Sequence, residues 1–166
     1  MLRIGLLSDT HGFLDKNIFK VFKDVDEIWH AGDIGTLQLC DELKNFKLFY
    51  AVFGNIDGKE IRAEFPLNLF LEREGFKILL THIGGYPGKY NPDARKVIEA
   101  EKPGLFICGH SHILKVMFDK QNNLLHINPG AAGVHGFHKM KTAVRLEIEG
   151  KEMKNLAVIE LGNRAG

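Results

Sequence analysis

The sequence predicts a layered α/β sandwich, on three observations. Short apolar runs recur along the chain and are bounded by glycine and polar residues, which is typical of buried strands. In the first half these runs alternate with segments whose apolar residues recur at helical spacing, which indicates parallel strands joined by helices. In the second half they follow one another across short turns, which indicates hairpins. We therefore expect two β-rich halves flanked by helices.

In the first half, the expected strands span residues 2–7, 27–29 and 48–53. Two helices are expected between them, on the apolar residues Leu14, Ile18, Val21, Phe22 and Val25, and then on Leu37, Cys40 and Leu43. A third helix is expected to begin at Asn91-Pro92, a capping residue followed by proline, and to end before Pro103.

In the second half, the expected strands span residues 67–72, 76–81, 105–108, 114–118, 124–128, 142–148 and 155–161. Hairpin turns are expected at residues 72–75, 119–123 and 149–151.

The bulk properties are those of an ordinary globular domain. The 166 residues suffice for one domain, expected to span 1–166, and 45% are hydrophobic and 26% charged. The formal net charge of +1 gives no electrostatic argument for nucleic acid or a membrane as a partner. Cys40 and Cys108 lie far apart in apolar segments, so we expect free thiols. With no signal peptide and no membrane-length apolar run, a cytoplasmic protein is expected.

Polar side chains follow five of the expected strands, at the point where each strand ends. The segments are Ser8-Asp9-Thr10-His11, His30-Ala31-Gly32-Asp33, Gly54-Asn55-Ile56-Asp57, Thr81-His82 and Gly109-His110-Ser111-His112. In α/β sheets, ligands bind beyond the carboxyl ends of the strands. Each segment alone has a common structural explanation as a turn or strand end. Their joint occurrence favours a metal site.

The spacing within these segments supports that interpretation. Asp9 and His11 are two residues apart, as are His110 and His112, so in extended chain each pair would project to one side. Glycines 32, 54 and 109 precede these polar residues, where a tight turn or close backbone approach is expected. Carboxylate, imidazole and amide ligands without thiolate suit Mn, Fe, Co, Ni or Zn in a catalytic site.

These residues resemble the calcineurin-like metallophosphoesterase superfamily, whose pattern is D-x-H, G-D, G-N-H-D/E, a single His, and G-H-x-H. The short length and Asn128-Pro129-Gly130 are similar to its compact bacterial and archaeal phosphodiesterase branch. The resemblance implies a four-layer α/β/β/α sandwich with two mixed β-sheets flanked by helices. It also implies a hydrolase that cleaves a small phosphoester with a metal-activated hydroxide at a dinuclear centre.

The resemblance further implies two divalent metal ions, with manganese expected and nickel, cobalt, iron or zinc as alternatives. The first would be held by Asp9, His11, Asp33 and His112, and the second by Asp33, Asn55, His82 and His110. Asp33, Asn55 and His82 are thereby the expected catalytic residues, as metal ligands.

One position departs from the family pattern. The family's Asn-His step is Asn55-Ile56 here, and isoleucine cannot protonate a leaving group. Loss of general acid catalysis typically costs roughly two to four orders of magnitude in rate. One alternative is a leaving group that needs little protonation. Another is that His135 or His138 donates the proton instead; the structural alternative is that both are exposed loop histidines.

The remaining polar residues carry weaker expectations. His30 and Asp57 are expected to support the ligands rather than to bind metal, and His126 to be structural. Arg62 and Arg95 are expected to be surface charges, and residues 84–90 a mobile loop beside the site.

Two classes of rival function stay open. One is a phosphomonoesterase or nucleotide pyrophosphohydrolase. The other is a non-catalytic interaction scaffold, as the resemblance to the retromer subunit of this fold implies, although seven intact ligand positions argue against it. A homo-oligomer closed by the apolar C-terminal strands is a further alternative, and no membrane partner is expected.

Overall fold

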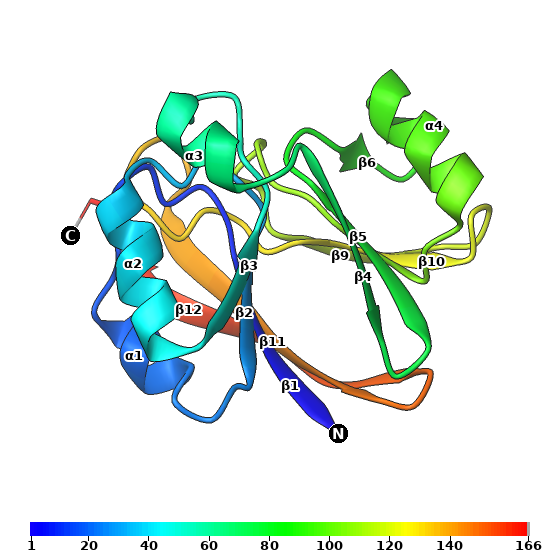
Figure 1. Cartoon of the computed structure of the whole chain (residues 1–166), viewed down its shortest axis with the longest axis horizontal. Helices are drawn as coiled ribbons and strands as arrows, with labels where there is room; N and C mark the ends of the chain where they lie inside the picture. Colours follow the sequence, from blue (N-terminus) through cyan, green and yellow to red (C-terminus); the bar gives the residue numbers. More distant parts are fainter. Residues whose placement is uncertain (166) are drawn as a thin grey trace.

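The computed structural model describes residues 1–165 and contains two five-stranded β-sheets packed face to face (Figure 1). The first sheet has the order β12 (Glu152–Asn163), β11 (Met140–Glu149), β1 (Leu2–Leu7), β2 (Glu27–His30), β3 (Leu48–Ala51). Strands β1, β2 and β3 are parallel, as predicted, and β11 and β12 add an antiparallel hairpin.

The second sheet has the order β4 (Asn68–Arg73), β5 (Phe76–Thr81), β8 (Leu105–Ile107), β10 (Leu124–Asn128), β9 (Lys115–Asp119). The predicted hairpins β4–β5, β9–β10 and β11–β12 are all present. Between its antiparallel edges the sheet has three parallel strands, β5, β8 and β10. The mixed sheet that the resemblance implies is therefore confirmed. The turn residues predicted the hairpins but not the parallel pairs, whose strands are joined by longer segments.

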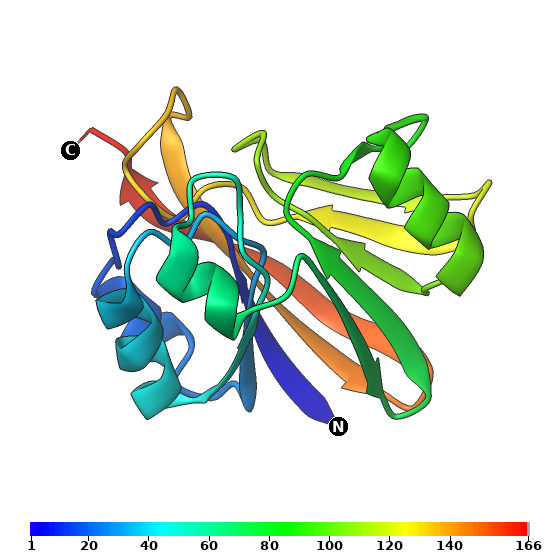
Figure 2. The same cartoon turned by 45° about the horizontal axis from the view of Figure 1, so that its top comes forward.

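Helices cover both outer faces, so the four-layer prediction is confirmed (Figure 2). Helices α1 (Asn17–Val21), α2 (Leu37–Phe46) and α3 (Lys59–Glu64) lie against the first sheet, and α4 (Pro92–Glu101) lies against the second. The Asn91 side chain accepts hydrogen bonds from Asp93 and Ala94 N–H at the start of α4, as its sequence predicts.

Two helix predictions need correction. The helix expected over residues 14–25 is one turn, although Ile18, Phe22 and Val25 still pack into the core. Asp15 accepts a hydrogen bond from Asn17 N–H and another from Lys141, which ties the preceding loop to β11. Helix α3 was not predicted, because only Ile61 of its six residues is buried and no apolar period exists to detect.

The hydrophobic core is divided by the two sheets. Trp29, Ile4, Leu6 and their neighbours fill the space between the sheets, while Leu7 faces the helices. Cys40 and Cys108 are buried free thiols, as expected, and burial raises the pKa of Cys108 to about 12. No helix within residues 1–165 has the length and hydropathy needed to cross a membrane.

The segment predicted as a mobile loop beside the site has regular structure. Residues 84–90 contain a small hairpin of β6 (Gly85–Tyr86) and β7 (Lys89–Tyr90). The Tyr90 hydroxyl donates a hydrogen bond to Asp119 over 2.8 Å, so this hairpin is fastened to the end of β9.

Candidate metal centre

Polar side chains from both sheets meet at one end of the sandwich. Three follow β1 and β2 of the first sheet, and three follow β5 and β8 of the second. They form two groups whose ligand atoms lie within 4.8 Å of one another: a first cluster of Asp9, His11 and His112, and a second cluster of Asp33, His82 and His110. The sequence placed all six at strand ends, and the fold brings them together.

Asp33 lies between the two clusters. Its Oδ2 is 3.4 Å from His11 Nε2 and 3.2 Å from His82 Nε2. Asn55 joins the second cluster, because its Oδ1 lies 3.0 Å from His110 Nδ1. In the first cluster, Asp9 Oδ1 is 3.2 Å from His112 Nε2. All seven predicted ligand residues therefore border one continuous site.

The donor atoms fit divalent cations. Asp9 Oδ1, His11 Nε2 and His82 Nε2 are buried and have no hydrogen-bond partner among residues 1–165. Each buried polar atom without a hydrogen-bond partner costs roughly 1–3 kcal/mol of folding free energy. Carboxylate and imidazole atoms that converge without bonding one another are what a metal ion of the Mn, Fe, Co, Ni or Zn kind requires.

The backbone of the site is strained rather than extended. Asp9, His11, Asp33, His110 and His112 all have positive φ, between 47° and 72°. Non-glycine residues rarely adopt this left-handed conformation, and it is concentrated at functional sites. The prediction that each D-x-H or H-x-H pair projects from extended chain is therefore wrong. In fact His110 and His112 point to different clusters.

The predicted glycines allow close approach. A side chain at Gly32 would collide with the His82 ring, one at Gly54 with Asp33, and one at Gly109 with Ser8 and Asp9. This confirms the expectation that backbone passes directly against the ligands at these three positions.

Hydrogen bonds fix the orientation of several ligands. Asp9 Oδ2 accepts bonds from the Ser8 hydroxyl over 2.6 Å and from His110 N–H over 3.1 Å, which leaves Oδ1 facing the site. His82 Nδ1 lies 2.7 Å from the Ala31 carbonyl oxygen. A carbonyl only accepts, so Nδ1 carries the hydrogen and Nε2 faces the carboxylates.

The site attracts positive charge. Burial alone would raise the pKa of Asp33, but contacts with His11, His82 and the Ile56 N–H outweigh it and hold that pKa far below its ordinary value. Burial would lower the pKa of His82, yet Asp33 and Asp9 raise it. The pKa of Asp9 is lowered as well, so both carboxylates are ionised at neutral pH and present negative charge to the site.

His30 supports the first cluster without joining it, as expected. Its Nδ1 accepts a hydrogen bond from Gly32 N–H over 3.0 Å, and its Nε2 lies 2.9 Å from the Thr10 hydroxyl. Thr10 in turn donates to the Ile34 carbonyl. Burial lowers the pKa of His30 to about 4, so the ring is neutral and holds the Asp9-to-His11 turn in place.

Asp57 and Arg62 support the second cluster. The buried Asp57 carboxylate accepts hydrogen bonds from the N–H groups of Ile34, Gly35 and Gly54. Arg62 donates to the carbonyl oxygens of Asp57 over 2.6 Å and Asn55 over 3.3 Å. Arg62 is an exposed surface charge, as expected, and its guanidinium in addition fastens the turn that carries Asn55. Arg95 is the exposed charge predicted and pairs with Glu99.

Ile56 and the two loop histidines lie at the edge of the site. Ile56 is 47% exposed and offers only its backbone N–H, to Asp33. The His135 ring stacks on His11 with a centroid separation of 4.6 Å, and the His138 ring packs against His112 at 5.4 Å. His138 also donates to the Gly133 carbonyl oxygen.

Sequence reasoning missed Ser8 and the role of Asn128. The buried Asn128 amide donates to the Gly109 carbonyl oxygen and to the Ser111 hydroxyl, which holds the His110-to-His112 turn. A polar residue at the end of an otherwise apolar strand is the signal that could have identified Asn128. His126, expected to be structural, is buried among Tyr90 and Phe106, and neither ring nitrogen has a hydrogen-bond partner within residues 1–165.

Comparison with known proteins identifies the family. Residues 2–151 match the calcineurin-like phosphoesterase superfamily domain. The chain belongs to this superfamily. A probable metallophosphoesterase of Methanocaldococcus jannaschii is 31% identical over 163 residues, which cover 95% of this chain and 81% of the relative.

Solved structures with a similar fold include the following two proteins. An archaeal phosphodiesterase is similar with a TM-score of 0.74 and 25% identity, and the match covers 95% of this chain and 100% of that chain. Vps29 of Chaetomium thermophilum is similar with a TM-score of 0.77 but only 14% identity, over 96% of this chain and 97% of the other. The chain is thus a hydrolase of the metallophosphoesterase family, which implies divalent metal ions, and its two ligand clusters fit that implication.

Proposed function

We propose that the protein is a phosphodiesterase that uses two divalent metal ions, one at each cluster. The observation that carries this proposal is Asp33, whose carboxylate lies between His11 of the first cluster and His82 of the second. Asp33 and the two clusters would hold the cations, whose chemistry when bound would be to lower the pKa of water and to offset the charge of the phosphate oxygens.

The chain's own residues orient that chemistry. Ser8 and the His110 N–H turn Asp9 Oδ1 toward the site, and the Ala31 carbonyl turns His82 Nε2 toward it. The Ile56 N–H holds the other oxygen of Asp33. The ligand atoms are thereby preorganised, which is the protein's main contribution to reactions of this class.

A diester is favoured over a monoester for two reasons. Ile56 stands where a proton donor would help the leaving group, so good leaving groups are preferred. Within residues 1–165, no lysine or arginine side chain makes a hydrogen bond or ion pair with a ligand side chain of either cluster, and Arg62 reaches only the backbone carbonyl of Asn55. A dianionic monoester would therefore gain little charge stabilisation beyond that of the metal ions. The similarity to an archaeal phosphodiesterase supports the same choice.

The first experiment compares an activated aryl phosphodiester with the matching monoester. Protein stripped of metal and then resupplied separately with manganese, nickel, cobalt or zinc is expected to hydrolyse the diester faster. Manganese is the expected best metal. Asp33→Asn should abolish turnover, whereas Asp41→Asn, a carboxylate exposed on α2, should not change it. Faster monoester turnover would establish the phosphomonoesterase or pyrophosphohydrolase alternative.

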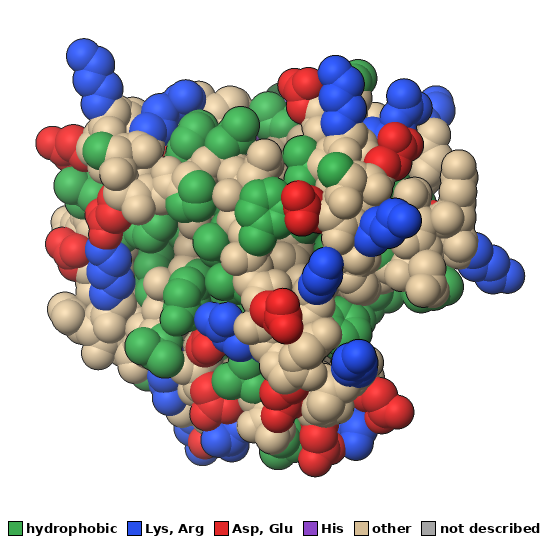
Figure 3. Space-filling view, turned by 45° about the vertical axis from the view of Figure 1, so that its right-hand side comes forward, with side chains coloured by type: hydrophobic (Ala, Val, Ile, Leu, Met, Phe, Trp, Pro, Cys, Tyr) green, Lys and Arg blue, Asp and Glu red, His purple; other side chains and the backbone are tan. Residues whose placement is uncertain are grey.

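A second candidate function is an interaction scaffold, as the fold similarity to Vps29 allows. Exposed Val116, Met117 and Phe118 on the edge strand β9 favour it. On the face seen in Figure 3, by contrast, positive and negative side chains are interspersed, which supports a small substrate over nucleic acid. Absence of turnover with every metal, in folded protein, would favour the scaffold.

A further inference from the structure

A groove continues from the second cluster toward α4. Asn55 and His82 are among the residues that line it, and its volume is about 300 Å³. It runs between the turn after β3, the start of β4 and the first turns of α4. Groups bound to a phosphate at the metal site would reach this groove directly.

The walls of the groove suit an uncharged organic group. Phe53, Leu67, Ile83 and Val97 provide apolar surface. Apart from His82, the charged side chains that line it are Arg62 and Asp93, whose opposite signs give no preference for a second anion. The groove is therefore not a further phosphate site.

One wall has a flat, rigid platform. The Arg62 guanidinium carbon lies 4.7 Å from the centre of the Phe53 ring, and hydrogen bonds to two carbonyl oxygens hold it there. The Arg62 side chain is exposed, so its second face is open. Guanidinium planes stack on aromatic groups, so the open face of Arg62 can hold a planar ring.

Asn68 supplies a polar contact in the same groove. It is half-buried at the start of β4, and its side-chain amide takes part in no hydrogen bond within residues 1–165. An amide offers a donor and an acceptor side by side, which is the pattern that recognises the edge of a nucleobase.

We propose that the groove binds a nucleoside, as the ester group that stays on the phosphate when the other is hydrolysed. The base would stack on Arg62, and Asn68 would contact its edge. In-line displacement places the leaving group away from the attacked side. Because Ile56 offers no proton, the leaving group is best placed in solvent, where water can protonate it. The groove then holds the ester group that stays on the phosphate. Hydrolysis would add water across the other ester bond, releasing an alcohol and a nucleoside monophosphate.

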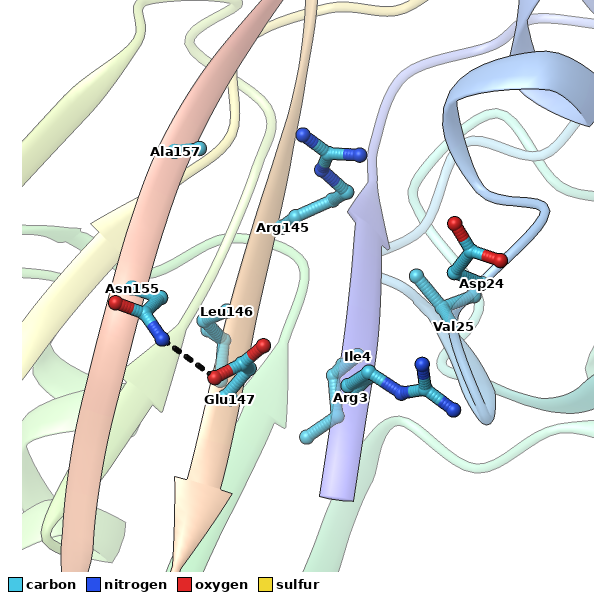
Figure 4. A pocket seen from close by; sticks show the side chains of 9 residues that line it. All are labelled: Arg3, Ile4, Asp24, Val25, Arg145, Leu146, Glu147, Asn155 and Ala157. Atoms are coloured by element: carbon cyan, nitrogen blue, oxygen red, sulfur yellow. Dashed lines mark hydrogen bonds between the residues drawn. The ribbon is translucent and has the colours of Figure 1, made fainter. Parts of the chain in front are cut away.

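This inference rests on the proposed phosphodiesterase function, but its binding step can be tested without turnover. Thymidine added at millimolar concentration to the metal-free protein should shift the NMR signals of Asn68, Ile83 and Val97. A second hollow, of about 370 Å³, is the internal control. It lies between β1, β11 and β12 and shares no lining residue with the groove (Figure 4). Shifts confined to that hollow, or none at all, would overturn the inference.

The control hollow is not expected to bind the probe, because no aromatic side chain lines it and its amide, Asn155, already donates to Glu147. Arg3 bonds to Asp26, and Arg145 donates to the Val21 carbonyl oxygen. Glu147 accepts a bond from Asn155, as Figure 4 shows.

A kinetic comparison tests the same groove in the metal-loaded protein. Thymidine 5′-(4-nitrophenyl) phosphate and methyl 4-nitrophenyl phosphate share a leaving group and differ only in the retained ester. We expect kcat/KM to favour the thymidine substrate by roughly tenfold or more, as a specific binding pocket allows. Asn68→Leu and Val97→Trp should each lower that ratio, and both should weaken the thymidine-induced NMR shifts.

Phe70→Ala is the matched control. Phe70 is 52% exposed on the same strand as Asn68 but does not line the groove, so the substrate ratio should stay at the wild-type value. Equal kcat/KM for the two substrates in the wild-type protein would overturn the inference while leaving the diesterase proposal intact. Hydrolysis of neither substrate, with thymidine still bound at Asn68, would instead overturn the proposed function and leave the groove assignment standing.

Discussion

The two ligand clusters differ in how firmly the chain encloses them. In the first, Asp9 is fully buried, and the rings of His11 and His112 are covered by His135 and His138. In the second, Asp33 and His82 are buried, but His110 and Asn55 are exposed beside the groove. We therefore expect the first cluster to hold its metal ion more tightly, and the second to be the side from which ions exchange and substrate enters.

The strongest test of this comparison removes the carboxylate that the clusters share. Asp33→Ala should lose both metal ions and lower metal affinity by more than about 100-fold, since ligand-supporting groups alone contribute roughly 10–100-fold. Metal content after dialysis, measured by mass spectrometry, checks this. Retention of two ions would show that the clusters do not depend on Asp33.

Replacing Asp57 should weaken metal binding at the second cluster more than at the first. Asp57→Ala leaves three N–H groups without their acceptor, two of them buried beside Asp33. We expect a loss of about 3 kcal/mol in the free energy of unfolding, measured by urea denaturation. Asp57→Asn, which keeps one acceptor oxygen, should lose less. Equal loss of metal from both clusters would contradict the selectivity.

Two buried histidines differ in whether their ring nitrogens have hydrogen-bond partners. His30, beside the first cluster, has a partner for each ring nitrogen, whereas His126, in the second sheet, has none within residues 1–165. Burial lowers the pKa of His126 to about 4. The unfolded chain therefore binds a proton first as the pH falls, and stability is lost between about pH 6.5 and pH 4.

His126→Leu should remove this part of the acid sensitivity. We compare the free energy of unfolding of the metal-free variant with that of the metal-free wild type. The difference, variant minus wild type, should be about 2 kcal/mol larger at pH 5 than at pH 7. Urea unfolding at the two pH values measures the difference. A wild-type-like pH dependence in the variant would show that His126 is already charged in the folded protein.

The smallest expected effect on metal binding comes from replacing one histidine of the turn that carries His110 and His112. His110→Ala should lose one metal ion and keep the other, because His110 belongs to the open cluster. His112→Ala should weaken binding of the ion at the first cluster by at least about tenfold, since even groups that only support a ligand contribute roughly 10–100-fold. Stepwise chelator titration distinguishes the two variants. If the losses were reversed, the first cluster would be the exchangeable one.

Much of the site could be predicted because metal ligands at strand ends leave a local pattern. The segments around Asp9, Asp33 and His110 each combine a buried strand, a glycine or tight turn, and a ligand. The partners of those ligands are harder to predict. Arg62 acts through backbone carbonyls five and seven residues away, which no local pattern indicates. The strand-end position of Asn128 is a local signal, but it does not reveal that the partners are Gly109 and Ser111 of another segment.

The fold followed the same rule. Strands and hairpin turns were predictable from apolar runs and turn residues, and the long helices from their periodicity. The parallel pairing of β5, β8 and β10 was not, because strand order depends on packing between distant segments. Helix α3 is too short to have a period, and α1 gives way to turns that still bury Phe22 and Val25.

The left-handed backbone at the ligands has a consequence for anyone who engineers this chain. Five ligand residues adopt a conformation that glycine tolerates and that other residues adopt at a cost of roughly 1–2 kcal/mol each. A search for thermostable variants carried out on the metal-free protein would therefore accept glycine at Asp9, His11 or His112 among its earliest improvements. Such a search would erase the metal centre before it altered the hydrophobic core, so selection has to be made with metal present.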